Sequence, residues 1–312
     1  MPTVAALNVY PIKSCRGTSL QSAMMTCAGL AYDREWMVVR QETGRFISQR
    51  ETSLLALVDV ALPAEVLSPA QWGTQLSAEA ALTVSAPGMP PLKVLMARRP
   101  DNEVRKVTVW RWTVAGADEG DDAAAWFSRY LGVAARLVRY LGSGGGVQQE
   151  ESALADLNTK MAEPLPMNRF RPNIESALAD LNTKMAEPLP MNRFRPNIEL
   201  TGAEPWDQDS WRHIDIACAA DGRTVRLTSV KPCSRCKITT TNQATGEVGD
   251  EPLDTLSTIR SGKVLGWNKD QKTWTHQVLF GWMVVSRNTG VLSVGDVLTV
   301  ASPQLAVLTP AA

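Results

Sequence analysis

Two cysteines, Cys233 and Cys236, stand three positions apart in the segment Lys231-Pro-Cys-Ser-Arg-Cys-Lys237. Nearby basic side chains favour the thiolate form of cysteine, and the thiolate is the form that attacks electrophiles and binds soft metals. The residue types and their spacing therefore predict a reactive or metal-binding cysteine in this segment.

The cysteine pair is open to three interpretations. A zinc site needs two further ligands, and His213 and Cys218 upstream do not complete the paired spacing that is typical of zinc motifs. A thioredoxin-like dithiol needs a helix at the cysteines, whereas residues 237–241, Lys-Ile-Thr-Thr-Thr, favour a strand. Two ordinary buried thiols are the third interpretation.

Residues 4–114 consist mainly of short β-rich runs separated by turn residues. The predicted strands are Val4–Tyr10, Trp36–Arg40, Leu54–Leu62, Ala81–Val84, Leu92–Met96 and Val104–Trp112. Acidic residues at 118–122 then precede a helix that we expect over Ala123–Leu131, because acidic side chains suit the first turn of a helix. This part of the chain therefore predicts a small β-sheet or barrel followed by one helix.

A second β-rich region follows the glycine-rich run at 142–146, which is typical of a linker. Strands are predicted at Ile198–Thr201, Arg223–Val230, Ile238–Thr241, Val278–Ser286 and Val297–Val300, and Gly295-Asp296 supplies a hairpin-type turn. The second of these strands leads into the cysteine pair. The predicted fold class is mostly β with helices (α+β).

A tandem repeat occupies the middle of the chain, where residues 151–174 and 175–198 are identical at all 24 positions. Repeats that stack into solenoids occur three or more times and drift in sequence, so two identical copies indicate a recent duplication or an artefact of the gene sequence. In the second copy, Leu178, Leu181 and Met185 fall on one face of a predicted helix, which the following prolines end.

The overall composition excludes several classes of protein. Basic and acidic side chains balance at 32 each, which argues against a nucleic-acid-binding surface. Five cysteines without a regular framework indicate free thiols or ligands in a reducing compartment. The N-terminus does not resemble a signal peptide, and no apolar run approaches the roughly eighteen residues of a transmembrane helix. We therefore expect a cytoplasmic or other intracellular protein.

The cysteine segment continues through Lys-Ile-Thr-Thr-Thr-Asn-Gln-Ala-Thr-Gly-Glu247. The whole stretch resembles the signature of MOSC-domain molybdenum-cofactor proteins of the amidoxime-reducing component (mARC) family. Four further segments resemble motifs of the same family in the same order, namely Tyr10–Gly17, Asp33–Trp36, Phe194–Ile198 and Val294–Val297. One short motif would be weak, but five in order along most of the chain are specific.

By this resemblance, Cys236 is the molybdenum ligand and a catalytic residue, and Arg235 is a second catalytic residue. The contacts to the molybdenum cofactor, Mo-molybdopterin, map to Lys13, Ser14, Arg34, Arg195, Asn197, Ser234 and Arg235. Guanidinium and ammonium groups suit the phosphate of molybdopterin, and hydroxyl and amide groups suit its pterin ring. Arg171 and Asn173, at the end of the first repeat copy, would be spare versions of Arg195 and Asn197.

The resemblance also implies an organisation and an activity. An N-terminal MOSC-associated β-barrel domain would span residues 1–141, a glycine-rich linker 142–150, and a MOSC β-barrel domain with the duplication 151–303. The implied reaction is reduction of N-hydroxylated compounds such as amidoximes and hydroxylamines, and nitrite reduction to nitric oxide would extend the same chemistry. Electrons would come from a b-type cytochrome and its flavin reductase, and the family is compatible with mitochondrial or peripheral membrane association.

Two other functions remain open. MOSC domains also serve as molybdopterin-binding or sulfur-carrier modules without turnover of their own, and a zinc-binding interaction module would use the cysteine pair. The family usually presents a strand with an aromatic-Leu run and nearby polar cofactor contacts before the helix of the repeat, whereas this chain has residues 144–150, Gly-Gly-Gly-Val-Gln-Gln-Glu, and the extra repeat copy. Turnover with a reduced electron donor separates a reductase from a carrier, and stoichiometric zinc without pterin would identify the third function.

Overall fold

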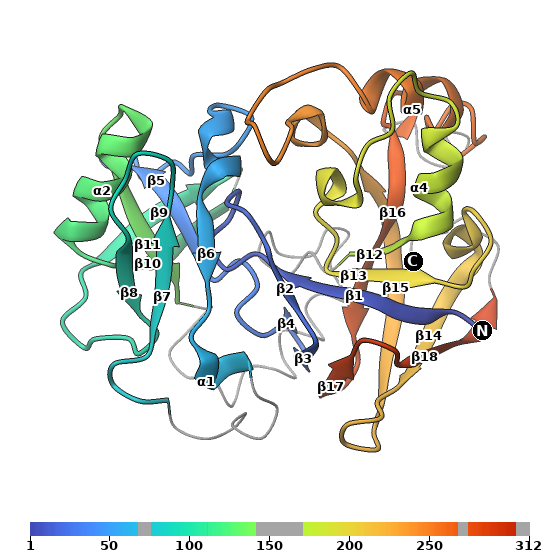
Figure 1. Cartoon of the computed structure of the whole chain (residues 1–312), viewed down its shortest axis with the longest axis horizontal. Coiled ribbons are helices and arrows are strands. Elements are labelled where there is room, and N and C mark those ends of the chain that lie inside the picture. The colour runs from blue at the N-terminus through green and yellow to red at the C-terminus, as the bar shows by residue number, and fades with distance from the viewer. Residues whose placement is uncertain (68–75, 111, 142–170, 268–273, 304–312) are drawn as a thin grey trace.

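The computed structural model describes residues 1–67, 76–110, 112–141, 171–267 and 274–303. The predicted linker at 142–150 and most of the first repeat copy, at 151–170, lie outside the described residues. The described chain is mostly β-structure with four α-helices, which confirms the predicted fold class (Figure 1).

The largest sheet combines the N-terminal strand with strands from the C-terminal half of the chain. Its order is β12 (Pro172–Ile174), β13 (Ile198–Thr201), β1 (Thr3–Val9), β18 (Val297–Pro303), β14 (Trp211–Ala217), β15 (Thr224–Ser234) and β16 (Leu279–Ser286), and β2 (Thr18–Leu20) pairs with β1. The end strands β12 and β16 also contact each other, so the sheet curls back on itself. In Figure 1, β1 accordingly starts near β14 and β18 of the C-terminal half and runs alongside β13 toward the N-terminal half of the molecule.

The described residues also form three smaller sheets. One contains β5 (Trp36–Arg40), β11 (Ala135–Tyr140), β10 (Trp112–Asp118) and β9 (Val104–Val109), and another contains β6 (Asp59–Ala61), β7 (Ala81–Ser85) and β8 (Leu92–Leu95). The last joins β17 (Gly290–Ser293) to β3 (Ser22–Thr26) and β4 (Gly29–Leu30). Since β17 follows β16 in the chain, this sheet also combines both halves. The domain boundary at residue 141 stays a prediction.

The described α-helices are α1 (Ala64–Leu67), α2 (Asp121–Leu131), α4 (Glu175–Asn182) and α5 (Leu253–Ile259). Short 3₁₀ helices are η1 (Ser53–Leu57), η3 (Met191–Phe194), η4 (Asp207–Ser210) and η5 (Lys237–Thr240). Helix α2 confirms the expected helix: Asp121 and Asp122 occupy its first turn, where the helix dipole favours negative charge, and Gly132 ends it with a φ of 67°. Helix α4 confirms a helix in the second repeat copy, with Leu181 fully buried. It ends at Asn182, however, so Met185 lies beyond it and the helix stops before the first proline, Pro188.

Three predicted strands are wrong in whole or in part. The strand predicted at Val104–Trp112 ends at Val109 as β9, and a turn at Trp110 precedes β10, which begins at Trp112. The strand predicted at Ile238–Thr241 is instead the 3₁₀ helix η5, in which Cys236 O accepts from Thr239 N at 2.9 Å. The Thr239 and Thr240 hydroxyls donate to carbonyls three residues back, and such local bonds compete with a strand ladder. The strand predicted at Leu54–Leu62 begins as η1 and becomes extended only at β6.

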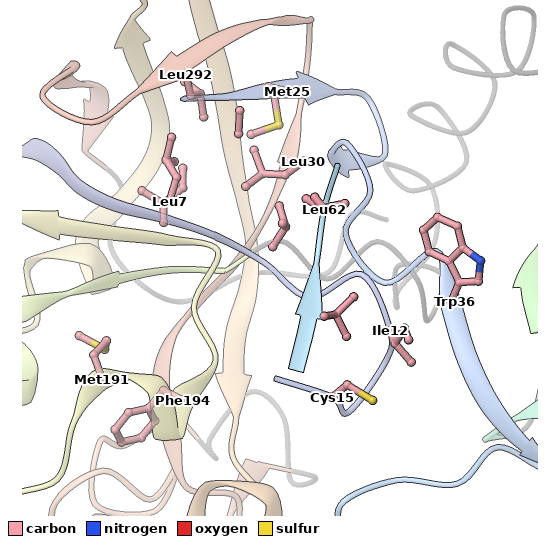
Figure 2. Close-up of a cluster of buried hydrophobic side chains, with 14 of the residues drawn as sticks. Leu7, Ile12, Cys15, Met25, Leu30, Trp36, Leu62, Met191, Phe194 and Leu292 are labelled. Carbon is pink, nitrogen blue, oxygen red and sulfur yellow. The ribbon is translucent and has the colours of Figure 1, made fainter. Parts of the chain in front are cut away.

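One hydrophobic core extends across both halves of the molecule. Figure 2 shows Leu7, Met25 and Trp36 in the same cluster as Phe194 and Leu292, which come from the C-terminal half. Each of these side chains is at most 1% exposed. Buried apolar area stabilises a fold by about 25 cal/mol per Å². Because both halves contribute to this core, their positions relative to each other are fixed. Residues from both halves can therefore form one site.

Candidate functional site

The cysteine segment lies where β15 leaves the largest sheet. A β-bulge interrupts the pairing of β15 with β16 between Pro232 and Ser234, and a bulge redirects the side chains beside it. Cys233 is fully buried, whereas Cys236 is partly exposed and lines a pocket. The two cysteines therefore have different environments, and Cys236 is the one that a ligand in the pocket can reach.

The pocket beside Cys236 is strongly basic. Its lining comes from both halves of the molecule and includes seven basic side chains and no acidic one among the described residues. The basic residues are Lys13, Arg34, Arg50, Arg171, Arg193, Arg195 and Arg235. Phe46 and Trp110 add an aromatic edge. Guanidinium and ammonium groups in this number bind phosphate and other oxyanions.

Six of the seven predicted cofactor positions line this pocket, namely Lys13, Ser14, Arg34, Arg195, Ser234 and Arg235. Asn197 is not part of the described lining. Its side chain is completely buried, accepts a bond from Arg34 Nη1 at 3.0 Å and donates one to Asn8 O at 3.0 Å. The structure therefore makes Asn197 a residue that holds Arg34 in position.

Four residues of the described pocket lining have backbone conformations in the left-handed region, with φ of 70° at Ser14, 59° at Arg34, 58° at Trp110 and 51° at Arg195. Such a conformation costs about 1–3 kcal/mol in a residue other than glycine and persists only where surrounding contacts hold it. The Tyr10 ring supplies such contacts, because the guanidinium carbons of Arg34 and Arg195 lie 4.6 and 4.2 Å from its centroid. Strain of this kind is common at functional sites.

Arg195 presents a donor without an acceptor. Its Nη1 donates to Gln243 Oε1 at 3.3 Å, but its Nη2 is buried and has no partner among the described residues. Burial lowers the pKa of Arg195 to about 10, and the nearby charges of Arg34 and Arg171 act in the same direction. A buried guanidinium of this kind is stabilised by a bound anion.

Arg235 is held by the protein itself. Its Nε donates to Phe280 O at 2.8 Å, and its Nη1 donates to Phe194 O at 2.8 Å. Its Nη2 donates to Phe280 O at 2.5 Å and to Asn173 Oδ1 at 3.2 Å. Burial lowers the pKa of Arg235 to about 10. A guanidinium has five N–H groups, so most donors of Arg235 are occupied; these contacts favour a positioning role, and the catalytic role stays a prediction.

Several residues of the described pocket lining were not among the predicted site residues, and Arg50, Trp110 and Arg193 are three of them. Arg50 Nε donates to Cys236 Sγ at 3.2 Å, and the Arg50 guanidinium lies 4.3 Å from the centroid of the Trp110 ring. Arg193 is 7% exposed. Arg193 could have been predicted as a site residue from its position two residues before Arg195. No sequence motif includes Arg50 or Trp110, which come close to Cys236 only in the folded chain.

Arg171 and Asn173 are not spares. Arg171 lines the pocket, and Asn173 is fully buried beside Arg235. The expectation rested on the second copy running directly into the segment that follows this motif in the family, but residues 172–174 of the first copy also form a strand, β12, which pairs with β13.

No three His, Cys, Asp or Glu side chains of the described ranges gather in an arrangement that could hold a metal ion. His213 lies on β14, with its Nδ1 at 3.2 Å from the Thr228 hydroxyl. Cys236 therefore stands in the pocket as a single thiol, and the zinc interpretation finds no support in this part of the chain. A metal at Cys236 would take its remaining ligands from a cofactor.

The fold and the site define a class of protein. Residues 1–134 match the family model of the MOSC N-terminal beta barrel domain, and residues 175–299 match that of the MOSC domain. Mitochondrial amidoxime reducing component 2 from Bos taurus is 31% identical over 94% of this chain and 82% of its own length, and the Homo sapiens protein of the same name is 30% identical with the same coverage. The chain belongs to the amidoxime-reducing component family of MOSC-domain proteins.

Two further proteins are similar over smaller parts of their own length. Molybdenum cofactor sulfurase from Drosophila mojavensis is 29% identical over 84% of this chain and 31% of the sulfurase. The crystal structure of YiiM from Geobacillus stearothermophilus is 14% identical and covers 43% of this chain and 54% of that chain, with a TM-score of 0.28. This last likeness is too low to add to the description of the fold.

Proposed function

We propose that this chain is a molybdenum-cofactor-dependent reductase of N-hydroxylated compounds, amidoximes and hydroxylamines among them. The observation that carries the proposal is the position of Cys236, a single partly exposed thiol in a pocket with seven basic and no acidic side chains in its described lining. Two relatives that match most of the chain are named for amidoxime reduction.

The pocket fits a pterin cofactor that bears a phosphate. Arg195 Nη2 and Arg171 Nε are buried donors without partners among the described residues, and such groups indicate a site completed by a ligand. Lys13 adds an ammonium group and Ser234 a hydroxyl to the same lining. When bound, the molybdenum cofactor would supply the two-electron redox chemistry, with the Cys236 thiolate as its protein ligand.

The remaining side chains would support this chemistry. Arg50 donates to Cys236 Sγ and so helps to hold the sulfur in position in the pocket. Phe46 and Trp110 offer apolar surface beside the thiol, and Trp110 is 45% exposed. A substrate with an aromatic group next to its N–O bond would therefore contact both the metal site and this edge.

Electrons would reach the site from other proteins. The sequence contains no dinucleotide-binding glycine fingerprint and no iron–sulfur cysteine run, so we propose a b-type cytochrome and its flavin reductase as donors. Nitrite reduction to nitric oxide belongs to the same proposal. In the described ranges, no helix is both long and apolar enough to cross a bilayer. Because the relatives are named as mitochondrial, a mitochondrial or other intracellular location is proposed on that basis.

A molybdopterin-binding or sulfur-carrier role without turnover is the second candidate. The likeness to molybdenum cofactor sulfurase over 84% of this chain favours it. A carrier would bind the cofactor but would not reduce N-hydroxylated compounds when a reduced electron donor is supplied.

The test compares the wild-type chain with Cys236→Ala and Cys233→Ala, all produced in a host that makes molybdopterin. Molybdenum, zinc and pterin are measured per chain, and an amidoxime and nitrite are offered with a reduced viologen. We expect molybdenum and turnover in wild type and in Cys233→Ala, the matched change at the buried thiol, and loss of both in Cys236→Ala. Molybdenum without turnover would indicate a carrier, and wild type without molybdenum would reject the proposal.

A further inference from the structure

The two copies of Arg-Pro-Asn-Ile lie side by side. Strand β12, from the first copy, runs parallel to β13, from the second, with Pro172 opposite Ile198. The carbonyl oxygen of Arg171 accepts bonds from the backbone N–H groups of Asn197 at 2.9 Å and Ile198 at 3.3 Å. The second copy therefore holds Arg171 in place at the wall of the pocket.

Asn173 fixes the first copy against the other end of the sheet. Its side chain is fully buried, and its Oδ1 accepts from Arg235 Nη2 at 3.2 Å. It also packs against Gly281 on β16, where φ is 72° and a Cβ would overlap Asn173 Oδ1. Glycine alone leaves room for the amide and adopts this φ without strain. Contacts on both sides thus set the position of β12, and with it that of Arg171.

Arg171 carries a charge that the pocket lining does not neutralise. Its Nε is buried without a hydrogen-bond partner, and the described lining of the pocket contains no carboxylate. Its charge also adds to the effect of burial in lowering the pKa of Arg195, so these two guanidinium groups are close enough to repel each other. Buried like charges are costly unless an ion of opposite charge joins them.

We propose that Arg171 binds an oxyanion in this pocket together with Arg195, whose Nη2 is the other buried donor without a partner in the described lining of the pocket. The inference rests on the proposed function where the oxyanion is the phosphate group of the cofactor. A free tetrahedral oxyanion would use the same donors. With either oxyanion, the duplication has added a binding residue, Arg171, to the site. Strand β13, from the second copy, holds Arg171 in position.

The first test uses the full-length chain from a host that cannot make molybdopterin, titrated with inorganic phosphate. Wild type is compared with Arg171→Gln and with Arg226→Gln, which removes the same charge from an exposed position of β15 outside this pocket. Charge-assisted bonds to phosphate are strong, so we expect affinity to fall roughly tenfold or more in Arg171→Gln and to stay unchanged in Arg226→Gln. Equal affinity in wild type and Arg171→Gln would overturn the proposal.

A second measurement needs no variant. Phenylglyoxal modifies arginine side chains, and peptide mass spectrometry separates the two copies because Glu175-Ser follows the first and Glu199-Leu follows the second. We expect inorganic phosphate to slow the modification of Arg171 and not that of Arg226. Absence of protection at Arg171 would overturn the proposal even where Arg171→Gln does not fold.

The source of the oxyanion is decided with the chain from a host that makes molybdopterin. If the cofactor supplies the phosphate group, the loaded wild type no longer binds inorganic phosphate, and Arg171→Gln loses pterin faster during dialysis. If the oxyanion is free, the loaded wild type still binds phosphate through Arg171. Failure of the proposed function is seen separately, as wild type without molybdenum, and it leaves the phosphate result for Arg171 standing.

Discussion

Arg50 Nε donates a hydrogen bond to Cys236 Sγ at 3.2 Å across a sequence separation of 186 residues. The bond joins an exposed arginine of the N-terminal half to the thiol that follows β15. The Arg50 guanidinium also stacks 4.3 Å from the centroid of the Trp110 ring, which limits where it can point. The N-terminal half therefore contributes directly to the environment of the thiol.

Arg50→Gln is expected to weaken metal retention at Cys236. Hydrogen bonds with a charged partner are roughly twice as strong as neutral ones, so loss of the guanidinium should raise the rate of molybdenum loss roughly tenfold. Molybdenum per chain after timed dialysis measures this. Arg45→Gln, at another exposed position of the same half, is the control, and equal retention in both variants would contradict the prediction.

Asn197→Ala is expected to destabilise the fold. The change removes the acceptor for Arg34 Nη1 and the donor to Asn8 O, both of which are buried. Each unsatisfied buried group costs about 1–3 kcal/mol, so the free energy of unfolding should fall by about 3 kcal/mol. Urea unfolding measures the loss. Asn192→Ala, at an exposed asparagine of the same motif, should change stability by less than about 0.5 kcal/mol; similar losses in the two variants would argue against this role for Asn197.

The buried thiol of Cys15 should make the free energy of unfolding fall at alkaline pH. Its side chain is fully buried, and burial raises the pKa of its thiol from 9.0 to about 12. Between these values the unfolded chain has released the proton and the folded chain keeps it, so the free energy of unfolding falls as the pH rises. The stabilisation that the protonated Cys15 thiol provides is complete below about pH 9 and is lost near pH 12. A pKa shift of this size corresponds to a free energy on the order of 4 kcal/mol.

Cys15→Ala should therefore flatten the alkaline loss of stability. Urea unfolding gives the free energy of unfolding of each chain at about pH 8 and about pH 11. The difference between these two free energies should be smaller in Cys15→Ala than in wild type. Cys27→Ala, at a partly buried cysteine, should keep the wild-type difference. An unchanged difference in Cys15→Ala would show that other groups cause the loss.

A single-copy chain tests the structural role of the duplication. The copies are identical, so deletion of residues 151–174 or of residues 175–198 gives the same polypeptide. One Arg-Pro-Asn-Ile cannot form both β12 and the start of β13, and the single-copy chain should lose the buried contacts of Asn173 and Ile174. We expect a Tm lower by about 5 °C or more and the weak phosphate binding of Arg171→Gln. A wild-type Tm and phosphate affinity would mean that residues 147–150 replace β12 without loss.

Local chemistry made much of the site predictable. The type and spacing of Cys233 and Cys236 by themselves indicated a reactive or metal-binding thiol, because thiolate chemistry depends on groups that are close in the chain. The seven predicted cofactor positions came instead from the resemblance to MOSC-domain proteins, and six of them line the pocket. The continuous apolar run of β16 and the helical spacing of apolar residues in α2 were also predictable.

The tertiary structure decided what local patterns cannot contain. Residues 238–241 have β-favouring side chains, yet they form a 3₁₀ turn because threonine hydroxyls bond back to their own backbone. Arg50 and Trp110 reach Cys236 through the packing of two distant segments. Arg171 and Arg195 belong to identical segments, so their sequences cannot distinguish them. Pairing of β12 with β13 and packing against Gly281 place Arg171 in the pocket, because a side chain's role depends on the contacts of its backbone in the fold.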